Sequence, residues 1–181
     1  AYYLFSDETA VDFVARDDNL IVVRTFSKAF GLASLRLGYC VANEARIKDL
    51  MLLRPVTDAN GLALKIGEYA LDHLDWILER VNDFNAGRDY LYDRLTESGL
   101  KTFRSHTNFM LIRYDSFEQA KDVMAKTRAK NYLLKGPFTF SPLENCVRVT
   151  LGPKKLIEQF WQDCGEILIA ANQTVVPEKQ A

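Results

Sequence analysis

The sequence has no excess of charge of either sign and no long apolar run. Its 181 residues include 23 Lys and Arg against 24 Asp and Glu, which gives a formal net charge of −1. A chain balanced in this way lacks the basic surface that nucleic-acid binding needs. No stretch approaches the roughly 20 apolar residues that a membrane-spanning helix requires. We therefore expect neither a nucleic acid nor a membrane as a partner.

Cysteine and histidine are also scarce. The three cysteines, Cys40, Cys146 and Cys164, lie far apart and form no CxxC pair, and only two histidines occur. This pattern supports neither a disulfide framework nor a metal site, so no metal is predicted. An odd number of separated cysteines is typical of a reduced, cytoplasmic protein. With 48% hydrophobic and 26% charged residues, the composition is that of an ordinary globular domain.

The first part of the chain alternates short apolar runs with polar connections. Residues 1–5 are expected to close a strand, and residues 19–24 are expected to form a short buried strand. A further strand is expected over residues 37–42. Asn43 then predicts the start of a helix over residues 44–53.

A long helical pattern occupies the middle of the chain. From Gly61 to about Ser98, apolar residues recur at three- and four-residue spacing, which predicts two helices or one long kinked helix that ends at Gly99. After Gly99 strands and helices are mixed, so the fold class is α/β. The elements expected there are a strand over 107–113, a helix over 116–130 capped by Ser116, strands over 132–135 and 146–151, a helix over 153–171 and a flexible tail over 173–181.

The segment RTFSKAFGLASLRLGY, residues 24–39, brings together groups that can bind a phosphate and attack a carbonyl. The hydroxyls of Thr25 and Ser27 together with the guanidinium of Arg36 can form a phosphate cradle. Lys28, in a confined site beside another cation, can act as a nucleophile toward an aldehyde. Pyridoxal phosphate carries both a phosphate and an aldehyde. The alternative is a solvated Ser-Lys loop with a surface arginine.

The spacing Ser-Lys-x-x-Gly-x-x-x-x-Arg-x-Gly-Tyr in this segment strongly resembles the lysine motif of fold-type-I pyridoxal-phosphate aminotransferases, particularly the histidinol-phosphate aminotransferase branch. The resemblance implies that Lys28 forms the Schiff base with the cofactor and moves a proton during the reaction. It further implies that Thr25, Ser27 and Arg36 bind the cofactor phosphate.

The start of the chain resembles a second element of this family. Ala1-Tyr2 looks like the end of the family's Asp-x-Ala-Tyr motif, which implies that the Tyr2 hydroxyl contacts the 3′-oxygen of the cofactor. The aspartate of the motif would precede residue 1. The alternative is that Tyr2 is a core aromatic residue next to Tyr3.

Three residues near the end of the chain are implied in substrate binding. The segment NCVRVTLG resembles the family strand whose arginine, here Arg148, binds the substrate α-carboxylate, although an ordinary surface ion pair would also suit it. Lys135 stands where the histidinol-phosphate branch has a second arginine for the substrate phosphate; it could equally be a solvated lysine. Asn108, in TNFMLI, resembles the asparagine that enters the small domain, where it is structural or lies near the substrate.

The resemblance covers residues 1–172 but only the C-terminal half of such an enzyme. It implies the remainder of the large, cofactor-binding domain over residues 1–83 and a small α/β domain over residues 84–172. We therefore expect a fragment, or the ordered part, of a longer chain. A homodimer is implied as well, because active sites of this family form at a dimer interface.

The function predicted from the sequence is transfer of an amino group between an amino acid or phosphorylated amine and a keto acid, with pyridoxal 5′-phosphate as cofactor, in amino-acid biosynthesis. One rival is a pyridoxal-phosphate-dependent decarboxylase of a phosphorylated amino acid, which the sequence does not separate from an aminotransferase. A rival of another class is an inactive regulatory or scaffold protein with the same fold. The presence of Lys28, Arg36 and Arg148 together argues against that last reading.

Overall fold

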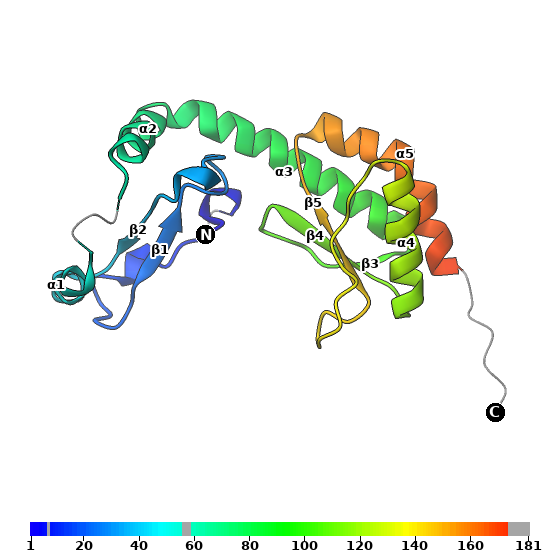
Figure 1. Ribbon diagram of the computed structural model, residues 1–181, viewed down its shortest axis with the longest axis horizontal. Helices are drawn as coiled ribbons and strands as arrows, with labels where there is room; N and C mark the ends of the chain where they lie inside the picture. The colour runs from blue at the N-terminus through cyan, green and yellow to red at the C-terminus, as the bar shows by residue number, and fades with distance from the viewer. Residues whose placement is uncertain (7, 56–58, 174–181) are drawn as a thin grey trace. The chain divides into compact units, whose positions relative to one another are not determined.

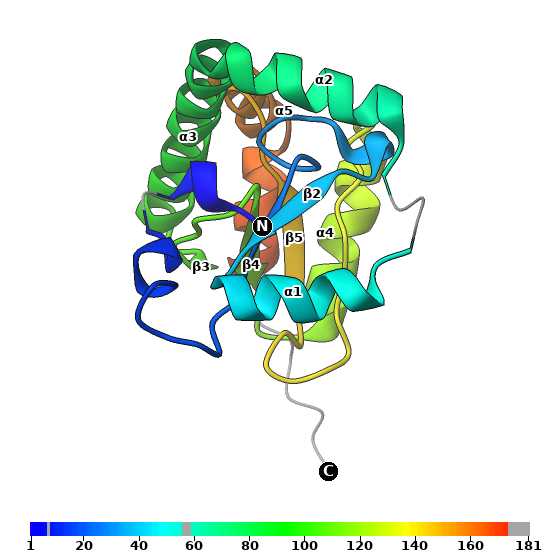
Figure 2. The same cartoon turned by 90° about the vertical axis from the view of Figure 1, so that its left-hand side faces the viewer.

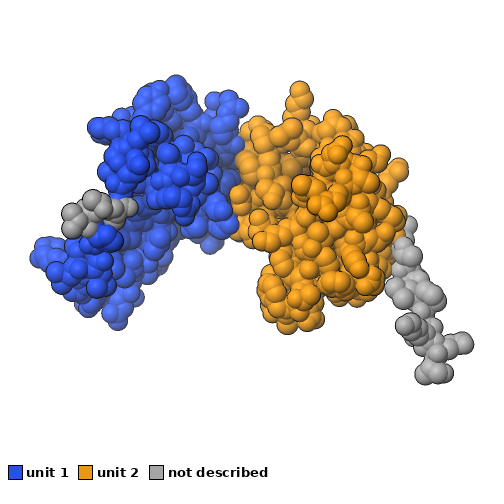
Figure 3. Space-filling view, in the orientation of Figure 1, with its two compact units in different colours: residues 1–81 blue, residues 82–181 orange. Residues whose placement is uncertain are grey.

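The computed structural model describes residues 1–6, 8–55 and 59–173 of the chain. It divides into two compact units, residues 1–81 (unit 1) and residues 82–181 (unit 2), which Figure 3 shows in different colours. The division falls within helix α3 (Leu74–Glu97), which begins in unit 1 and ends in unit 2. Among the described helices, none combines the length and the apolar character needed to cross a membrane.

Unit 1 is built on one antiparallel pair of strands, β1 (Val22–Thr25) and β2 (Gly38–Val41). Val22 lies opposite Val41, and Thr25 lies opposite Gly38. In Figures 1 and 2 this pair lies between the helices α1 (Glu44–Leu53) and α2 (Gly61–Asp72). Three short 3-10 turns complete the unit: η1 (Tyr3–Phe5), η2 (Val11–Phe13) and η3 (Ala33–Leu35).

Asparagine side chains begin both complete helices of unit 1. The Oδ1 atom of Asn43 accepts a hydrogen bond from the backbone N–H of Arg46 at 2.9 Å, so the predicted start of α1 is confirmed. Asn60 caps α2 in the same way, accepting from Leu62 at 2.8 Å and from Ala63 at 3.3 Å. These contacts satisfy backbone donors that the first turn of a helix leaves without a partner.

Two expectations for unit 1 were wrong. Residues 1–5 do not close a strand: η1 forms there, with the N–H of Phe5 donating to the carbonyl of Tyr2 at 2.9 Å. The strand near residue 22 forms, but Arg24 is its one buried residue, and Val23 is 66% exposed. The physical reason is that the described sheet of unit 1 has two strands, so the outer face of β1 has little to pack against.

Unit 2 is a three-stranded antiparallel sheet with helices packed on it. The strand order is β3 (Lys101–Thr102), β4 (Phe109–Arg113) and β5 (Cys146–Thr150). Helices α4 (Phe117–Ala129), α5 (Lys154–Gln173) and the second part of α3 share one apolar core with the sheet. The strands contribute Met110, Ile112, Val147 and Val149 to this core, and these residues are opposite one another in the register.

From Gly61 onward, most element boundaries follow the sequence prediction. The helical pattern over residues 61–98 forms two helices, α2 and α3, separated at His73, and Gly99 follows α3 with a left-handed φ of 73°. Ser116 caps α4 with a capping box that includes Gln119. Of the tail expected over 173–181, Gln173 is the last residue of α5, and residues 174–181 lie outside the described residues.

One predicted strand of unit 2 is wrong. Residues 132–135 form no strand; a single bridge pairs Lys135 with Arg148. The pairing stops there because Gly136 has a φ of 131°, outside the extended region of a strand, and Pro137 has no N–H to donate.

Candidate active site

Lys28 lies in the turn that follows β1. The N–H of Gly31 donates to the carbonyl of Lys28 at 2.9 Å, and the N–H of Leu32 donates to the carbonyl of Phe26 at 3.0 Å. Gly31 has a φ of 68°, a left-handed conformation that glycine adopts without steric cost. The turn therefore holds its backbone in one shape, and the side chain of Lys28 is exposed.

The fold brings Lys28 and Tyr2 together, although 25 residues separate them in the sequence. The Nζ atom of Lys28 lies 5.9 Å from the centroid of the Tyr2 ring. Tyr2 is half-buried and directly precedes η1. An amine and a phenol at this separation can contact different atoms of one small aromatic ligand.

Thr25 and Ser27 form a local turn next to the lysine. The Oγ1 atom of Thr25 accepts a hydrogen bond from the backbone N–H of Ser27 at 3.0 Å. Such a hydroxyl-to-backbone contact fixes the turn that leads from β1 to Lys28. Both side chains are half-buried, so their hydroxyls lie at the surface of the turn and not in a sealed core.

Arg36 lies at the other end of the same connection. It follows η3 with a left-handed φ of 53°, an uncommon conformation for a residue with a side chain. Its Nη1 atom donates to the carbonyl of Ala33 at 2.8 Å, and its side chain is exposed. Arg36 is two residues before Gly38, the register partner of Thr25, so the β1–β2 pairing holds it near the Thr25 end of the turn. Backbone strain of this kind is common at functional sites.

Arg148 is the central residue of the second predicted group, which lies in unit 2. Its guanidinium carbon lies 4.7 Å from the centroid of the Phe109 ring on the neighbouring strand. Its Nε atom is buried and has no hydrogen-bond partner among the described residues. A buried donor without a partner is costly, and an anionic ligand would satisfy it.

Lys135 and Asn108 lie on either side of this arginine. The N–H of Arg148 donates to the carbonyl of Lys135 at 2.7 Å, and the N–H of Lys135 donates back at 3.1 Å. Lys135 is exposed, whereas Asn108 is half-buried and its carbonyl accepts from Leu151 at 2.9 Å. The three residues predicted to bind substrate thus lie on neighbouring segments: Arg148 in β5, Lys135 in the segment bridged to it, and Asn108 directly before β4.

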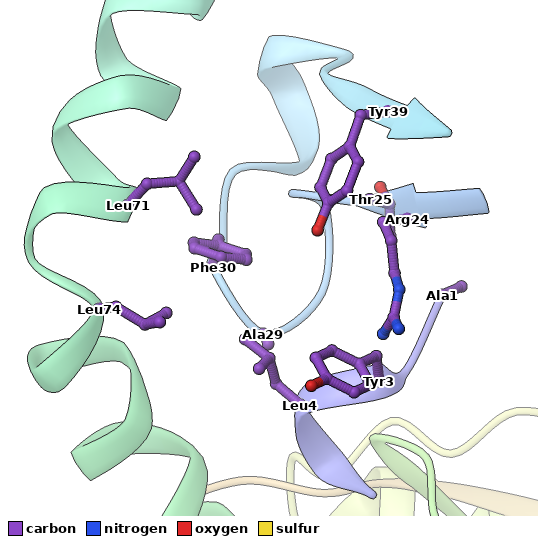
Figure 4. A pocket seen from close by; sticks show the side chains of 10 residues that line it. All are labelled: Ala1, Tyr3, Leu4, Arg24, Thr25, Ala29, Phe30, Tyr39, Leu71 and Leu74. Atoms are coloured by element: carbon purple, nitrogen blue, oxygen red, sulfur yellow. The ribbon is translucent and has the colours of Figure 1, made fainter. Parts of the chain in front are cut away.

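Sequence reasoning gave no role to Arg24, Tyr3 or Phe109. Arg24 is only 9% exposed, and its guanidinium carbon lies 3.4 Å from the centroid of the Tyr3 ring. Figure 4 shows both side chains in the lining of a small cavity of about 110 Å³ in unit 1. The available sequence clue was a charged residue within the apolar strand run, directly before Thr25.

The arrangement of elements defines the class of fold. Both units together resemble the C-terminal part of fold-type-I pyridoxal-phosphate enzymes, so the expected fold is confirmed. The structure of histidinol-phosphate aminotransferase from Sinorhizobium meliloti, in complex with pyridoxal-5′-phosphate, matches 94% of the chain with a TM-score of 0.79 and 21% identity. L-threonine-O-3-phosphate decarboxylase from Porphyromonas gingivalis matches 92% of the chain with a TM-score of 0.74 and 23% identity. The chain covers 47% and 53% of these two proteins, respectively.

The chain belongs to the family described as aminotransferase class I and II, whose pattern matches residues 1–162. Histidinol-phosphate aminotransferase 1 from Carboxydothermus hydrogenoformans is 33% identical over 168 residues, which are 93% of this chain and 47% of that relative. The chain therefore spans about half the length of the curated relatives it matches. The resemblance stated from the lysine motif is confirmed.

Proposed function

We propose that the protein is a pyridoxal-phosphate-dependent aminotransferase of the histidinol-phosphate aminotransferase type. It transfers an amino group between an amino acid or phosphorylated amine and a keto acid. The observation that carries the proposal is the position of Lys28 beside Tyr2, at the end of a strand whose Thr25–Ser27 turn supplies hydroxyls. The membership of the chain in the aminotransferase class I and II family supports the same conclusion.

The donor set of unit 1 has the chemistry that pyridoxal phosphate requires. An amine, two hydroxyls and a guanidinium lie along one connection, and a phenol lies beside the amine. Lys28 would hold the cofactor covalently and, once released, move a proton from the substrate Cα. Thr25, Ser27 and Arg36 would hold the phosphate, and the Tyr2 hydroxyl would contact the 3′-oxygen. When bound, the cofactor supplies an aldehyde for the amino group and a ring that withdraws electrons.

The residues of unit 2 would bind the substrate. The guanidinium of Arg148 matches a planar carboxylate, and its buried Nε has no hydrogen-bond partner among the described residues. Lys135 is the backbone partner of Arg148, and side chains of paired residues lie on the same face of a sheet. A lysine binds phosphate as a point charge, which favours a phosphorylated or acidic amine. Asn108 would lie near that substrate.

Three broader features complete the proposal. We assign the protein to amino-acid biosynthesis, because the relatives it matches are histidinol-phosphate aminotransferases. A cytoplasmic location is supported by three free cysteines, Cys40, Cys146 and Cys164. A homodimer is proposed as the active form, by likeness to the family. Its test is the mass of the full-length protein in solution.

The decisive experiment is the visible spectrum of the full-length protein with pyridoxal phosphate, recorded for wild type and Lys28→Ala. We expect an absorption band of the lysine-bound cofactor that the substitution abolishes. Amine donors, including phosphorylated ones, can then be compared by their bleaching of the band and by the keto acid formed. Release of CO₂ in place of a keto acid would make the protein a decarboxylase. No band at excess cofactor would leave the inactive scaffold as the better reading.

A further inference from the structure

Arg24 is the buried cation of unit 1, and its surroundings are unusual. It is 9% exposed, and no carboxylate among the described residues forms an ion pair with it. Its partners are the ring of Tyr3, whose centroid lies 3.4 Å from the guanidinium carbon, and the Oγ1 atom of Thr9, which accepts from Nη2 at 2.5 Å. A buried guanidinium is costly unless it is partnered, so these two contacts decide where Arg24 can lie.

The two contacts attach the N-terminal segment to strand β1. Tyr3 begins η1, whose bonds run from Phe5 to the carbonyl of Tyr2 and from Ser6 to the carbonyl of Tyr3. Thr9 accepts from Arg24 and also from the backbone N–H of Val11 at 3.1 Å. The Arg24 side chain of β1 thereby contacts the first residue of η1 and a residue that follows η1.

The same strand leads directly to the lysine. Arg24 is followed by Thr25 in β1, and the turn with Lys28 comes next. Tyr2 is the neighbour of Tyr3, and its ring lies 5.9 Å from the Nζ atom of Lys28. The stack of Arg24 on Tyr3 therefore links the two segments whose separation sets the distance between Tyr2 and Lys28.

The space around the stack makes this link sensitive to substitution. Arg24 and Tyr3 line a cavity of about 110 Å³ whose other walls include Leu4, Phe30 and Leu74. Figure 4 shows the guanidinium above the Tyr3 ring, with Leu71, Leu74 and Phe30 on the other side of the cavity. Removing the guanidinium would enlarge the cavity beside Tyr3, and the ring would lose its main polar contact. Tyr3, and with it Tyr2, would then have room to move.

We propose that Arg24 is a positioning residue that acts through Tyr3 to hold Tyr2 beside Lys28. This inference rests on the proposed function, because the distance between Tyr2 and Lys28 matters only if both contact one cofactor. It goes beyond that function in assigning the buried arginine and the second tyrosine a task in organising the site. Neither residue touches the reacting atoms.

The test measures cofactor binding by the full-length protein, in wild type and in a Tyr2→Phe background. Arg24→Met and Tyr3→Leu are each expected to weaken binding of added pyridoxal phosphate about tenfold, the loss typical when one large side chain is no longer held in its binding position. Both are expected to shift the pH at which the visible band titrates in the direction that Tyr2→Phe shifts it. Tyr3→Phe, which keeps the stacked ring, restores most of the affinity. Arg16→Met, at an exposed arginine 5.1 Å from the Phe13 ring, is the matched control.

The double variant separates positioning from general stability. If Arg24 acts through Tyr2, then Arg24→Met in the Tyr2→Phe background changes the affinity less than twofold beyond Tyr2→Phe alone. The inference is overturned if the losses of affinity from Arg24→Met and Tyr2→Phe multiply in the double variant. It is also overturned if Arg24→Met lowers thermal stability but leaves the affinity and the band titration unchanged. Absence of a Lys28-dependent band in the wild-type protein is a different result, because it overturns the proposed function itself.

Discussion

The two units bury their apolar side chains very differently. Unit 2 has one continuous core to which α3, α4, α5 and the sheet all contribute. Among the described residues of unit 1 the buried apolar ones are few: Phe5, Val14, Phe26, Ala63 and Val81. The exposed large apolar residues in the part of unit 1 that the structure describes are Tyr3, Phe13, Ile21, Val23, Tyr39, Met51, Leu52, Leu53, Leu62, Leu64, Tyr69, Leu71, Trp76 and Leu78.

This contrast separates two sources of stability. Burial of apolar area is the main favourable contribution to folding, and in unit 2 the buried core is formed by the unit's own residues. Unit 1 depends more on individual polar contacts, such as the Asn43 and Asn60 helix caps and the stacking of Arg24 on Tyr3. Exposed apolar surface of this extent is typical of a face that another surface covers. The residues of the candidate cofactor site therefore lie in the unit with the smaller buried apolar core.

The largest expected effect compares one leucine in each unit. Leu95 in α3 is 0% exposed, whereas Leu53 at the end of α1 is 82% exposed. We expect Leu95→Ala to lower the free energy of unfolding of unit 2 by about 2–5 kcal/mol, because it leaves a cavity in a packed core. Leu53→Ala should change that of unit 1 by less than about 0.5 kcal/mol, because it removes no packed contact.

The two tryptophans allow each unit to be followed by itself. Trp76 lies in unit 1 and Trp161 in unit 2, so urea unfolding is measured by fluorescence with Trp76→Phe as the background for Leu95→Ala and Trp161→Phe for Leu53→Ala. Similar losses for the two alanines would show that the units are stabilised in the same way.

The elements of the chain could be predicted largely from local sequence. Periodicity and capping residues placed α1 and α4, because these depend on neighbours a few residues away. The helical pattern over residues 61–98 was also correct, but the sequence did not give the position of the break at His73 between α2 and α3. The errors were at places where pairing partners decide the structure. Residues 1–5 and 132–135 are apolar or β-prone, yet in the described structure the first form η1 and the second make one bridge with Arg148.

The candidate site was predictable where its residues are close in the sequence. Thr25, Ser27, Lys28 and Arg36 share one connection, and its spacing alone was informative. The contacts of Arg24 and Phe109 were not visible, because each joins a guanidinium to a ring from another segment: Arg24 to Tyr3, and Arg148 to Phe109. Stacking between segments far apart in the chain cannot be recognised from residue spacing in a single sequence.

An intermediate effect compares two helix-interior glycines. A Cβ at Gly87 in α3 would lie 2.5 Å from the carbonyl oxygen of Gly152 and 3.2 Å from the Cα of Lys154, which are backbone atoms. A Cβ at Gly67 in α2 would meet the end of the Leu37 side chain, which can rotate away. We expect Gly87→Ala to destabilise unit 2 by about 1–3 kcal/mol. Gly67→Ala should be neutral, because up to about 1 kcal/mol of helix propensity offsets the shift of Leu37.

The same fluorescence experiment measures both glycine variants. A stable Gly87→Ala protein would mean that α3 and the start of α5 can separate without loss, and that unit 2 is less tightly packed than its core implies. A strong loss for Gly67→Ala would instead mean that α2 packs on Leu37 and Phe26 as rigidly as the helices of unit 2 pack on each other.

The smallest expected effect concerns the hydrogen bond between Tyr132, after α4, and Asp163 in α5. The Tyr132 hydroxyl donates to the Oδ2 atom of Asp163 at 2.6 Å, and the Nε2 atom of Gln159 donates to the same oxygen at 3.1 Å. The hydrogen bond to Asp163 raises the pKa of Tyr132 to about 12, and it lowers the pKa of Asp163. The stability from Asp163 is therefore present above its unfolded pKa of about 3.9 and is lost as the pH falls through the lowered folded value. That from Tyr132 is present below about pH 10 and is lost as the pH rises through about 12.

Tyr132→Phe keeps the ring that lies 5.3 Å from Phe160 but removes the hydroxyl. We expect the pKa of Asp163 to rise toward its ordinary value, measured by NMR titration of the side-chain carboxyl carbons. Glu68 in unit 1 is the internal control, because its pKa is lowered by Lys65 within the same helix and should not change. An unchanged pKa for Asp163 would mean that Gln159 and the charge of Lys130 hold the carboxylate, and that the contact from Tyr132 to α5 does not persist in solution. Because the Tyr132–Asp163 pair is solvent-accessible, we expect its contribution to the free energy of unfolding to be small.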